Sequence, residues 1–352
     1  MNIYYLSDSW PWLGDHTGYH QLPYYIKKFN TKTQVIKSKY GLSQRLIGRA
    51  YSICKGWWQR RDSIYAAAEY KFSHLVSKQP REENSIFHVL YFDVHYFLWE
   101  HWRKAPKNVI GTIHHSPGRA FPLRMKENLK HLSSAIVLTS CDIDFYESSI
   151  GKGRVKFIHH GVDTDFFKPV QNIVRDSKRL LFTGQNGRNT EMLYRVIIKL
   201  VKRHPELRFD LLVRKKKRET KGLKYLINHP NISWHENISD EALCNLYKQS
   251  YLLLQPMQDC AANNAIVEAL ACGLPIVTTD VGGIRDYGGG TIYPVVANNN
   301  DDAMVDLVEK YLAEPDWSNE IAEKCREFAE QSLAWPIIAQ KHLEVYQELA
   351  FE

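Results

Sequence analysis

Several features that define large protein classes are missing from this sequence of 352 residues. No apolar run approaches the ~20 residues that a membrane-spanning helix needs, so we expect no such helix. The first residues form a short uncharged stretch followed at once by Asp8, which suits a first strand better than a secretory signal. The six cysteines show no paired C-x-x-C spacing, and we interpret them as reduced thiols of a cytoplasmic protein.

Acidic residues are absent from one long stretch. From Lys27 to Arg61 there are ten basic residues and no acidic one. Residues 1–171 hold 24 basic and 14 acidic residues, a balance of +10, whereas residues 172–352 have a balance of −3. A basic excess confined to one half indicates an anionic partner: nucleic acid, a membrane surface or an acidic substrate.

What is present is a globular composition, with 44% apolar and 24% charged residues, over a length typical of two domains. Short, branched and largely unalternated apolar runs alternate with amphipathic segments, which predicts parallel sheets covered by helices on both faces. The predicted strands are residues 2–6, 86–91, 109–113, 135–139, 155–159, 179–182, 209–213, 232–234, 251–255 and 276–278. The predicted helices include residues 18–29, 122–132, 142–149, 190–203, 239–249, 264–271 and 301–313.

This alternation predicts an α/β protein with two Rossmann-like domains facing a central cleft. The pattern is interrupted in residues 167–178, around Pro169, where we expect the boundary. Ligands of open parallel sheets bind beyond the carboxyl ends of the strands, so the loops there are the places to search for chemistry.

The strongest local signal is residues 259–283, DCAANNAIVEALACGLPIVTTDVGG. Asn263 or Asn264 is a good N-cap for a short helix, and Gly273 and Pro275 end it. The amides at such a helix start favour a phosphate, and Glu268, one turn inside, can accept hydrogen bonds from the vicinal hydroxyls of a sugar. The alternative is a packed αβ unit whose glycines only serve turns.

These residues carry a family resemblance. The segment 264–283, with EA, GLP and GG at their present spacing, resembles the donor-binding signature of family-four retaining glycosyltransferases. VKFIHHGVDTDFFKP at 155–169 resembles the interdomain segment of that family, and residues 333–349 resemble its returning C-terminal helix. The resemblance is dense from about residue 109 to 349 and thin before it. It implies the GT-B fold, with an acceptor-side domain of residues 1–168 joined by 335–352, and a donor domain of 169–334.

The resemblance also implies roles for individual residues. Arg188 and Glu268 would act on the donor, together with one of His114 and His115, of which His114 fits the strand-end position better. The remaining donor-binding candidates are Gly18, Gly184, Arg214, Lys215, Asp259, Asn263, Asn264 and Ala265. Asp15 and His16, in the loop after the first strand, are weaker candidates.

The sequence departs from the family pattern at one position. The family commonly has two glutamates, and the first would fall at Cys260, so Asp259 or Asn263 would have to replace it. No cofactor is implied beyond the UDP- or GDP-linked donor. No metal is expected either, because Asp163-x-Asp165 lies in the interdomain segment and is interpreted as structural.

The segment from Leu42 to Arg61 has the composition of an interfacial helix. Leu42, Leu46, Ala50, Ile53, Cys54, Trp57 and Trp58 project on one broad face, and basic residues flank them. We therefore expect attachment to an anionic membrane, on the inner face of the plasma membrane, and not nucleic-acid binding. The alternative is an ordinary surface helix that packs its tryptophans on the domain.

The function that these observations predict is sugar transfer to a glycan or lipid-linked acceptor, as in bacterial cell-surface polysaccharide synthesis (lipopolysaccharide, capsule or exopolysaccharide). Three alternatives stay open: a nucleotide-sugar epimerase of the same architecture, a nucleic-acid-binding protein, and a catalytically inactive family member. An assay with donor alone separates the first from a transferase.

Overall fold

The structure is a computed structural model that describes residues 1–8, 14–37, 42–54, 63–78, 84–96, 106–117, 123–170 and 175–351. The chain divides into two compact units. Unit 1 comprises Met1–Leu13, Gly18–His159 and Trp335–Glu352, and unit 2 comprises Gly14–Thr17 and His160–Ala334.

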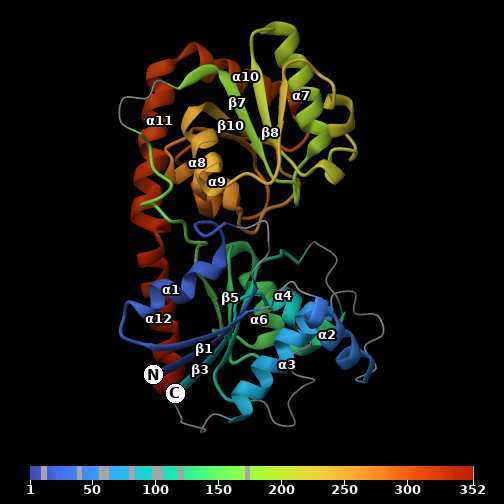
Figure 1. The fold of residues 1–352 in the computed structure, drawn as a ribbon. Coiled ribbons are helices and arrows are strands. Elements are labelled where there is room, and N and C mark those ends of the chain that lie inside the picture. Colours follow the sequence, from blue (N-terminus) through green and yellow to red (C-terminus); the bar gives the residue numbers. More distant parts are fainter. Residues whose placement is uncertain are drawn as a thin grey trace. The chain divides into compact units, whose positions relative to one another are not determined.

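Unit 1 is built on a parallel sheet of six strands in the order β2-β1-β3-β4-β5-β6 (Figure 1). The strands are β1 (Asn2–Ser7), β2 (Lys32–Lys37), β3 (Ser85–Val89), β4 (Val109–Ile113), β5 (Ser134–Val137) and β6 (Val155–Phe157). The helices are η1 (Tyr19–Gln21), α1 (Leu22–Lys27), α2 (Leu42–Cys54), α3 (Ser63–Lys78), α4 (Phe92–His95), α5 (Leu123–Leu129), η3 (Ser140–Asp142), α6 (Ile143–Ile150) and α12 (Trp335–Phe351).

The sequence prediction missed β2, so unit 1 has six strands where five were expected. The missed strand reads KTQVIK and forms the edge of the sheet, with exposed and half-buried residues alternating along it. An edge strand needs only one covered face and carries lysines at its exposed positions, so it lacks the continuous apolar run of a central strand.

The helix α12 supplies buried polar groups to unit 1. The Tyr346 hydroxyl lies 2.6 Å from His88 Nδ1 and accepts a hydrogen bond from the Tyr5 hydroxyl at 3.3 Å. His342 Nε2 lies 2.6 Å from the Tyr19 hydroxyl. Tyr5 and Tyr346 are 341 residues apart in the sequence, and Tyr19 and His342 are 323 apart. Because these side chains are buried together, α12 is part of the core of unit 1.

Unit 2 has its own parallel sheet of six strands in the order β12-β11-β10-β7-β8-β9 (Figure 1). The strands are β7 (Asp176–Thr183), β8 (Arg208–Leu212), β9 (Ile232–His235), β10 (Ser250–Gln255), β11 (Ile276–Thr279) and β12 (Val295–Val296). The helices are α7 (Thr190–Arg203), η4 (Lys215–Lys217), η5 (Leu223–Leu226), α8 (Asp240–Gln249), α9 (Asn264–Ala271), η6 (Gly282–Tyr287), α10 (Asp301–Ala313), α11 (Pro315–Phe328) and the π-helical turn η7 (Ala329–Leu333). The two-residue strand β12 is too short to leave a sequence pattern and was not predicted.

Local sequence explains why the helices of unit 2 begin where they do. Asn189, Ser239 and Asn300 each cap a helix by accepting a hydrogen bond from a backbone N–H in its first turn. The predicted bounds of α7, α9 and α10 match the structure because caps and apolar periodicity agree there.

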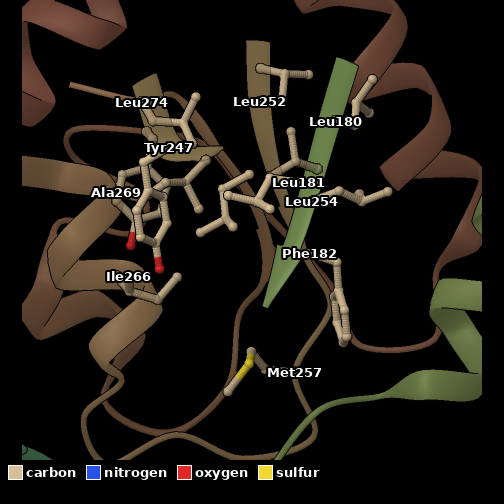
Figure 2. Packing of buried hydrophobic residues seen from close by; sticks show 14 of the residues in the cluster. Leu180, Leu181, Phe182, Tyr247, Leu252, Leu254, Met257, Ile266, Ala269 and Leu274 are labelled. Carbon is tan, nitrogen blue, oxygen red and sulfur yellow. The ribbon is translucent and has the colours of Figure 1, made fainter. Parts of the chain in front are cut away.

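The core of unit 2 is apolar. Figure 2 shows Leu180 and Leu181 of β7, Leu252 and Leu254 of β10 and Ile266 of α9 gathered in it. These side chains are fully buried or nearly so, and their burial supplies the main stabilisation of the sheet that presents the loops described below.

The helix α2 exposes apolar side chains. Leu42 is 76% exposed, Leu46 61% and Ile53 43%, and Arg45 and Arg49 are exposed as well. None of its described side chains is buried, and of its described residues only Gly48, which has no side chain, is. Trp57 and Trp58, the aromatic part of the predicted interfacial helix, lie outside the described residues, as do Arg60 and Arg61.

Candidate functional site

The strand order of unit 2 defines a switch point between β7 and β10. Successive strands run outward from β7 through β8 to β9 and from β10 through β11 to β12, as in the Rossmann fold. The loops after β7 and β10 meet there: Asn189 N–H donates to Pro256 O at 2.9 Å, and Gln258 N–H donates to Gly187 O at 2.8 Å. Ligands of this fold bind at such a point.

The start of α9 lies at this switch point. Asn263 is the N-cap, and its Oδ1 accepts a hydrogen bond from Ala265 N–H at 2.9 Å. Of the two caps that the sequence allowed, the structure selects Asn263 and makes Asn264 the first helical residue. Gly273 lies just past the helix in the left-handed conformation, as its C-terminal signal predicted.

Arg188 joins the two loops. Its Nη2 donates to Asn263 Oδ1 at 3.0 Å, its Nε to Thr183 O at 3.0 Å and its Nη1 to Asn186 O at 2.7 Å. Gly184 makes this possible, because its φ is +80° and a Cβ there would lie 2.6 Å from the guanidinium. A fixed cation therefore lies beside the amide-rich start of a helix, an arrangement that favours an anion.

Glu268, inside α9, is only 4% exposed. Its Oε1 accepts a hydrogen bond from the Thr17 hydroxyl at 2.9 Å, and its Oε2 accepts one from the Tyr247 hydroxyl at 2.8 Å. Burial raises the pKa of this carboxyl to about 8, against the effect of the two donors. Sequence reasoning found Glu268 but neither hydroxyl, since no sequence signal links positions 17, 247 and 268.

The position of the missing first glutamate is occupied by a buried side chain. Cys260 is 4% exposed, and its carbonyl accepts a hydrogen bond from Gly283 N–H. Asp259, next to it, is half-buried, and its N–H donates to Gly187 O at 3.5 Å. Of the two residues, Asp259 is thus the one with accessible surface in this loop.

Arg214 and Lys215 follow β8, which pairs with β7. Gly184 N–H donates to Leu212 O, so the ends of the two strands are level. The Lys215 side chain is exposed, and its backbone N–H donates to Glu236 Oε2 at 2.7 Å. Arg214 and Lys215 therefore lie at the strand end next to that of β7.

In unit 1, His114 ends β4 and is held on several sides. Its backbone N–H donates to Asp93 Oδ2 at 2.7 Å, and its Nε2 lies 2.8 Å from Leu90 O. Its ring stacks on Tyr91 and meets the edge of Tyr19, with centroids 4.6 and 4.9 Å away. Burial lowers the pKa of His114, and a carbonyl can only accept, so the neutral ring carries its proton on Nε2 and has an acceptor at Nδ1.

His115 is exposed and pairs with the same aspartate, its Nδ1 3.3 Å from Asp93 Oδ1. Burial alone would raise the pKa of Asp93, but the hydrogen bonds and charges of His115 and His114 hold it below the usual value. Asp93 was not predicted, although it follows a predicted strand, and a polar residue directly after a buried strand is the signal by which His114 was selected.

Gly18, also in unit 1, has φ 101° and ψ 167°, a conformation that only glycine adopts readily.

A second polar cluster in unit 1 lies at its own switch point, between β1 and β3. His95 Nε2 is 3.2 Å from both carboxylate oxygens of Asp8, and His95 Nδ1 is 3.2 Å from Glu69 Oε1. All three side chains are fully buried. Burial alone would lower the pKa of His95, but the two carboxylates raise it to about 9, so the histidine is a cation at neutral pH.

In the described part of the chain, no group of three His, Cys, Asp or Glu side chains is placed to hold a metal ion. No helix in that part combines the length and the apolar character needed to cross a membrane.

The sequence of unit 2 matches a known family. Residues 177–328 match the family model described as glycosyl transferases group 1. A D-inositol 3-phosphate glycosyltransferase of Nocardiopsis dassonvillei is 25% identical over 217 residues, which are 55% of this chain and 50% of that protein. The chain therefore spans about half the length of the curated relatives it matches.

Solved structures match over the whole chain. Sucrose-phosphate synthase from Thermosynechococcus elongatus superposes with a TM-score of 0.77 at 16% identity, covering 99% of this chain and 98% of that one. Anabaena Alr3699/HepE in complex with UDP-glucose gives a TM-score of 0.69 at 12% identity, covering 99% and 100%. At these identities the likeness shows the fold, which confirms the predicted α/β class with two Rossmann-like sheets. The chain has the GT-B fold, and its residues 177–328 are similar to the glycosyl transferases group 1 family.

Proposed function

We propose that this chain transfers a sugar from a UDP- or GDP-linked donor to a glycan or lipid-linked acceptor, with retention at the anomeric carbon. Unit 2 would bind the donor and unit 1 would face the acceptor. The observation that carries the proposal is the guanidinium of Arg188, hydrogen-bonded to the N-cap of α9 at the switch point of unit 2. The similarity of the fold to the solved structure of Anabaena Alr3699/HepE in complex with UDP-glucose supports it.

The geometry suits departure of a nucleoside diphosphate. As the bond between the anomeric carbon and the diphosphate breaks, negative charge develops on the β-phosphate. Arg188 and the amide of Asn264 would stabilise that charge without reorganising, since three hydrogen bonds fix the guanidinium and the Asn263 cap fixes the start of α9. Arg214 and Lys215, at the next strand end, would contact the rest of the nucleotide.

We propose the reaction as independent of a metal because local groups can neutralise the diphosphate. The Asp-x-Asp of the interdomain segment, Asp163 and Asp165, is engaged elsewhere: Asp163 Oδ1 accepts from Asp165 N–H and Phe166 N–H, and its Oδ2 lies 2.7 Å from His16.

Contacts to the donor sugar would come from His114 and Asp259. The neutral ring of His114 has an acceptor at Nδ1, so it would accept a hydrogen bond from a sugar hydroxyl. Asp259 would replace the first glutamate of the family pattern, since Cys260 is buried. Glu268 would accept from the ribose hydroxyls.

We further propose that the acceptor lies at an anionic membrane, on the inner face of the plasma membrane, in bacterial cell-surface polysaccharide synthesis. The exposed Leu42, Leu46 and Ile53 of α2, next to Arg45 and Arg49, support this proposal. Apolar side chains bury into the interface while basic ones attract anionic lipid.

A two-stage experiment tests the transferase. A thermal-shift screen against nucleotide sugars should give one donor that raises the unfolding temperature, because a ligand at 100 times Kd adds about 2.7 kcal/mol to stability. That donor, radiolabelled in the sugar, is then incubated with membrane glycolipid extract. Label in the lipid fraction supports transfer, whereas epimerisation of the donor without any acceptor would contradict it.

A further inference from the structure

A four-residue segment of the N-terminal region belongs to unit 2. Gly14–Thr17 packs with His160–Ala334, although the residues before and after it are assigned to unit 1. Its anchor is His16: the ring stacks on Phe166 with centroids 3.8 Å apart, and its Nδ1 lies 2.7 Å from Asp163 Oδ2. The His16 backbone N–H donates to Asp240 Oδ2 at 2.9 Å.

The segment ends on the carboxyl group of Glu268. The Thr17 hydroxyl donates to Oε1 and the Tyr247 hydroxyl to Oε2, so each oxygen already accepts from a protein hydroxyl. Glu268 is 4% exposed and Thr17 8% exposed. Each carboxylate oxygen has a second lone pair, but Oε1 is buried under Thr17, so a ribose hydroxyl reaches Oε1 only when Thr17 moves aside.

Only one of the two hydroxyls can leave at small cost. Tyr247 of α8 is fully buried in the core of unit 2 (Figure 2). Its ring meets that of Phe167 edge-on, with centroids 6.1 Å apart. Thr17 lies on a segment that makes no backbone–backbone hydrogen bond to any described residue. Its hydrogen bonds to the described part of unit 2 all go to side chains, those of Asp163, Asp240 and Glu268, so it can detach without breaking a helix or a sheet.

We propose that Thr17 is a donor-site residue that occupies the place of a ribose hydroxyl when no nucleotide is bound. Nucleotide binding exchanges one hydroxyl donor for another on Glu268 Oε1 and releases Gly14–Thr17 from unit 2. No covalent bond or charge changes in the exchange. The inference rests on the proposed function, because it takes the ribose of a nucleoside diphosphate as the incoming group.

The glycine that begins the segment fits this role. A Cβ at Gly14 would fall within 2.2 Å of the Asp240 carboxylate, whose Oδ2 accepts the His16 N–H. The segment thus packs closely against the first turn of α8, because Gly14 has no side chain and the His16 N–H donates one hydrogen bond to Asp240. This contact can form and break without change elsewhere in α8.

Affinity for the nucleotide tests the exchange. Calorimetric titrations with UDP and with GDP compare the wild type with Thr17→Val, which keeps the shape and removes the hydroxyl. Because the variant has no competing donor, the nucleotide should bind about 3- to 10-fold more tightly, the ratio expected for one hydrogen bond. His16→Ala, which removes the anchor, should tighten binding in the same direction. Thr17→Ser should restore the wild-type value.

Thr291→Val is the matched control, since its hydroxyl also lies in unit 2 and donates to Gly288 O at 3.2 Å. It should leave the affinity unchanged. Hydrogen–deuterium exchange gives an independent reading: UDP should increase exchange in the peptide that contains residues 14–17. Inorganic pyrophosphate, which has no ribose, should not.

The outcomes separate the inference from the function. If the wild type binds UDP or GDP and Thr17→Val binds it equally or more weakly, Thr17 only supports Glu268 and the exchange is wrong. Added protection of residues 14–17 by UDP would also overturn it. If neither the wild type nor the two loosened variants bind a nucleoside diphosphate, the proposed function itself fails.

Discussion

Units 1 and 2 have the same kind of sheet but place their polar groups differently. In unit 2 the core is apolar, and the polar side chains Arg188 and Asn263 lie in loops at the switch point. In unit 1 the polar groups are inside, with Asp8, Glu69 and His95 fully buried at its switch point. The switch point of unit 2 thus carries a half-buried arginine on a helix cap, whereas that of unit 1 carries a fully buried histidine between two carboxylates.

The largest expected effect concerns the buried charges of unit 1. His95→Ala leaves Asp8 and Glu69 as buried carboxylates without their cation, which should cost about 3–5 kcal/mol in the free energy of unfolding. Urea unfolding, with hydrogen exchange to assign the loss to unit 1, measures it. His74→Ala, on the exposed side of α3, is the control and should change stability by less than about 0.5 kcal/mol. A loss below 1 kcal/mol for His95→Ala would mean that the cluster is neutral.

The next effect concerns the cation of unit 2. Arg188→Lys keeps a charge but loses the planar fork that holds Thr183 O, Asn186 O and Asn263 at once. The rate of transfer should fall about 10²- to 10³-fold, as when one donor to a developing anion is removed. Single-turnover kinetics with saturating donor measures it. Arg208→Lys is the control, since Arg208 bonds only to nearby carbonyls. Wild-type turnover in Arg188→Lys would contradict the assigned role.

Rising pH should destabilise the two units over different ranges. The folded pKa of His95, about 9, lies above its unfolded value of 6.5. Its contribution is therefore fully present below pH 6.5 and is lost as pH rises through 9. The folded pKa of Glu268, about 8, lies above 4.5, so the unfolded state ionises first and unit 2 loses stability between pH 4.5 and 8.

Urea midpoints measured from pH 4 to 10 test these windows through paired variants. Glu268→Gln should flatten the decline between pH 4.5 and 8, and His95→Gln the decline between 6.5 and 9. If the urea midpoint of each variant falls with pH as steeply as that of the wild type, Glu268 and His95 do not have the raised pKa values assumed here.

The charge difference between the units gives a smaller effect. Arg45→Glu with Arg49→Glu on α2 should weaken binding to vesicles that contain phosphatidylserine by about 1 kcal/mol or more per residue. Co-sedimentation at low and physiological salt measures it. Reversing two exposed arginines of unit 2, Arg203 and Arg208, should have little effect. Equal loss from both pairs would show that net charge alone determines binding.

The smallest effect compares two helix caps. Asn263→Ala and Asn300→Ala each remove a side chain that accepts a hydrogen bond from a first-turn N–H, at 2.9 and 3.1 Å. Each should cost about 1 kcal/mol of stability. Only Asn263→Ala should also weaken nucleotide binding, because Asn263 holds Arg188. Equal nucleotide affinity in the two variants would mean that Asn263 caps α9 but has no part in nucleotide binding.

Much of this molecule could be predicted from sequence because its signals are local. Apolar runs predict the buried central strands, and the cap residue and Gly273 predict the two ends of α9. The candidate site residues Arg188, Asn263 and Glu268 were selected from that local pattern together with the family resemblance. The edge strand β2 was missed because its exposed lysines hide the run.

The positioning residues could not be found in the same way. Thr17, Tyr247 and Glu268 meet only because the chain folds, and nothing in the residues around Thr17 distinguishes it from an ordinary loop threonine. Asp93 is different, since it follows a predicted strand and could have been selected by the rule that selected His114.

The returning helix α12 has a consequence for synthesis of the chain. Tyr346 and His342 complete hydrogen bonds to His88 and Tyr19, so unit 1 cannot close its core until the ribosome has made its last helix. Residues 160–334 of unit 2 are contiguous and emerge before that. The first unit to be translated is thus the last to finish folding, and during that interval the strands of unit 1 remain a target for chaperones.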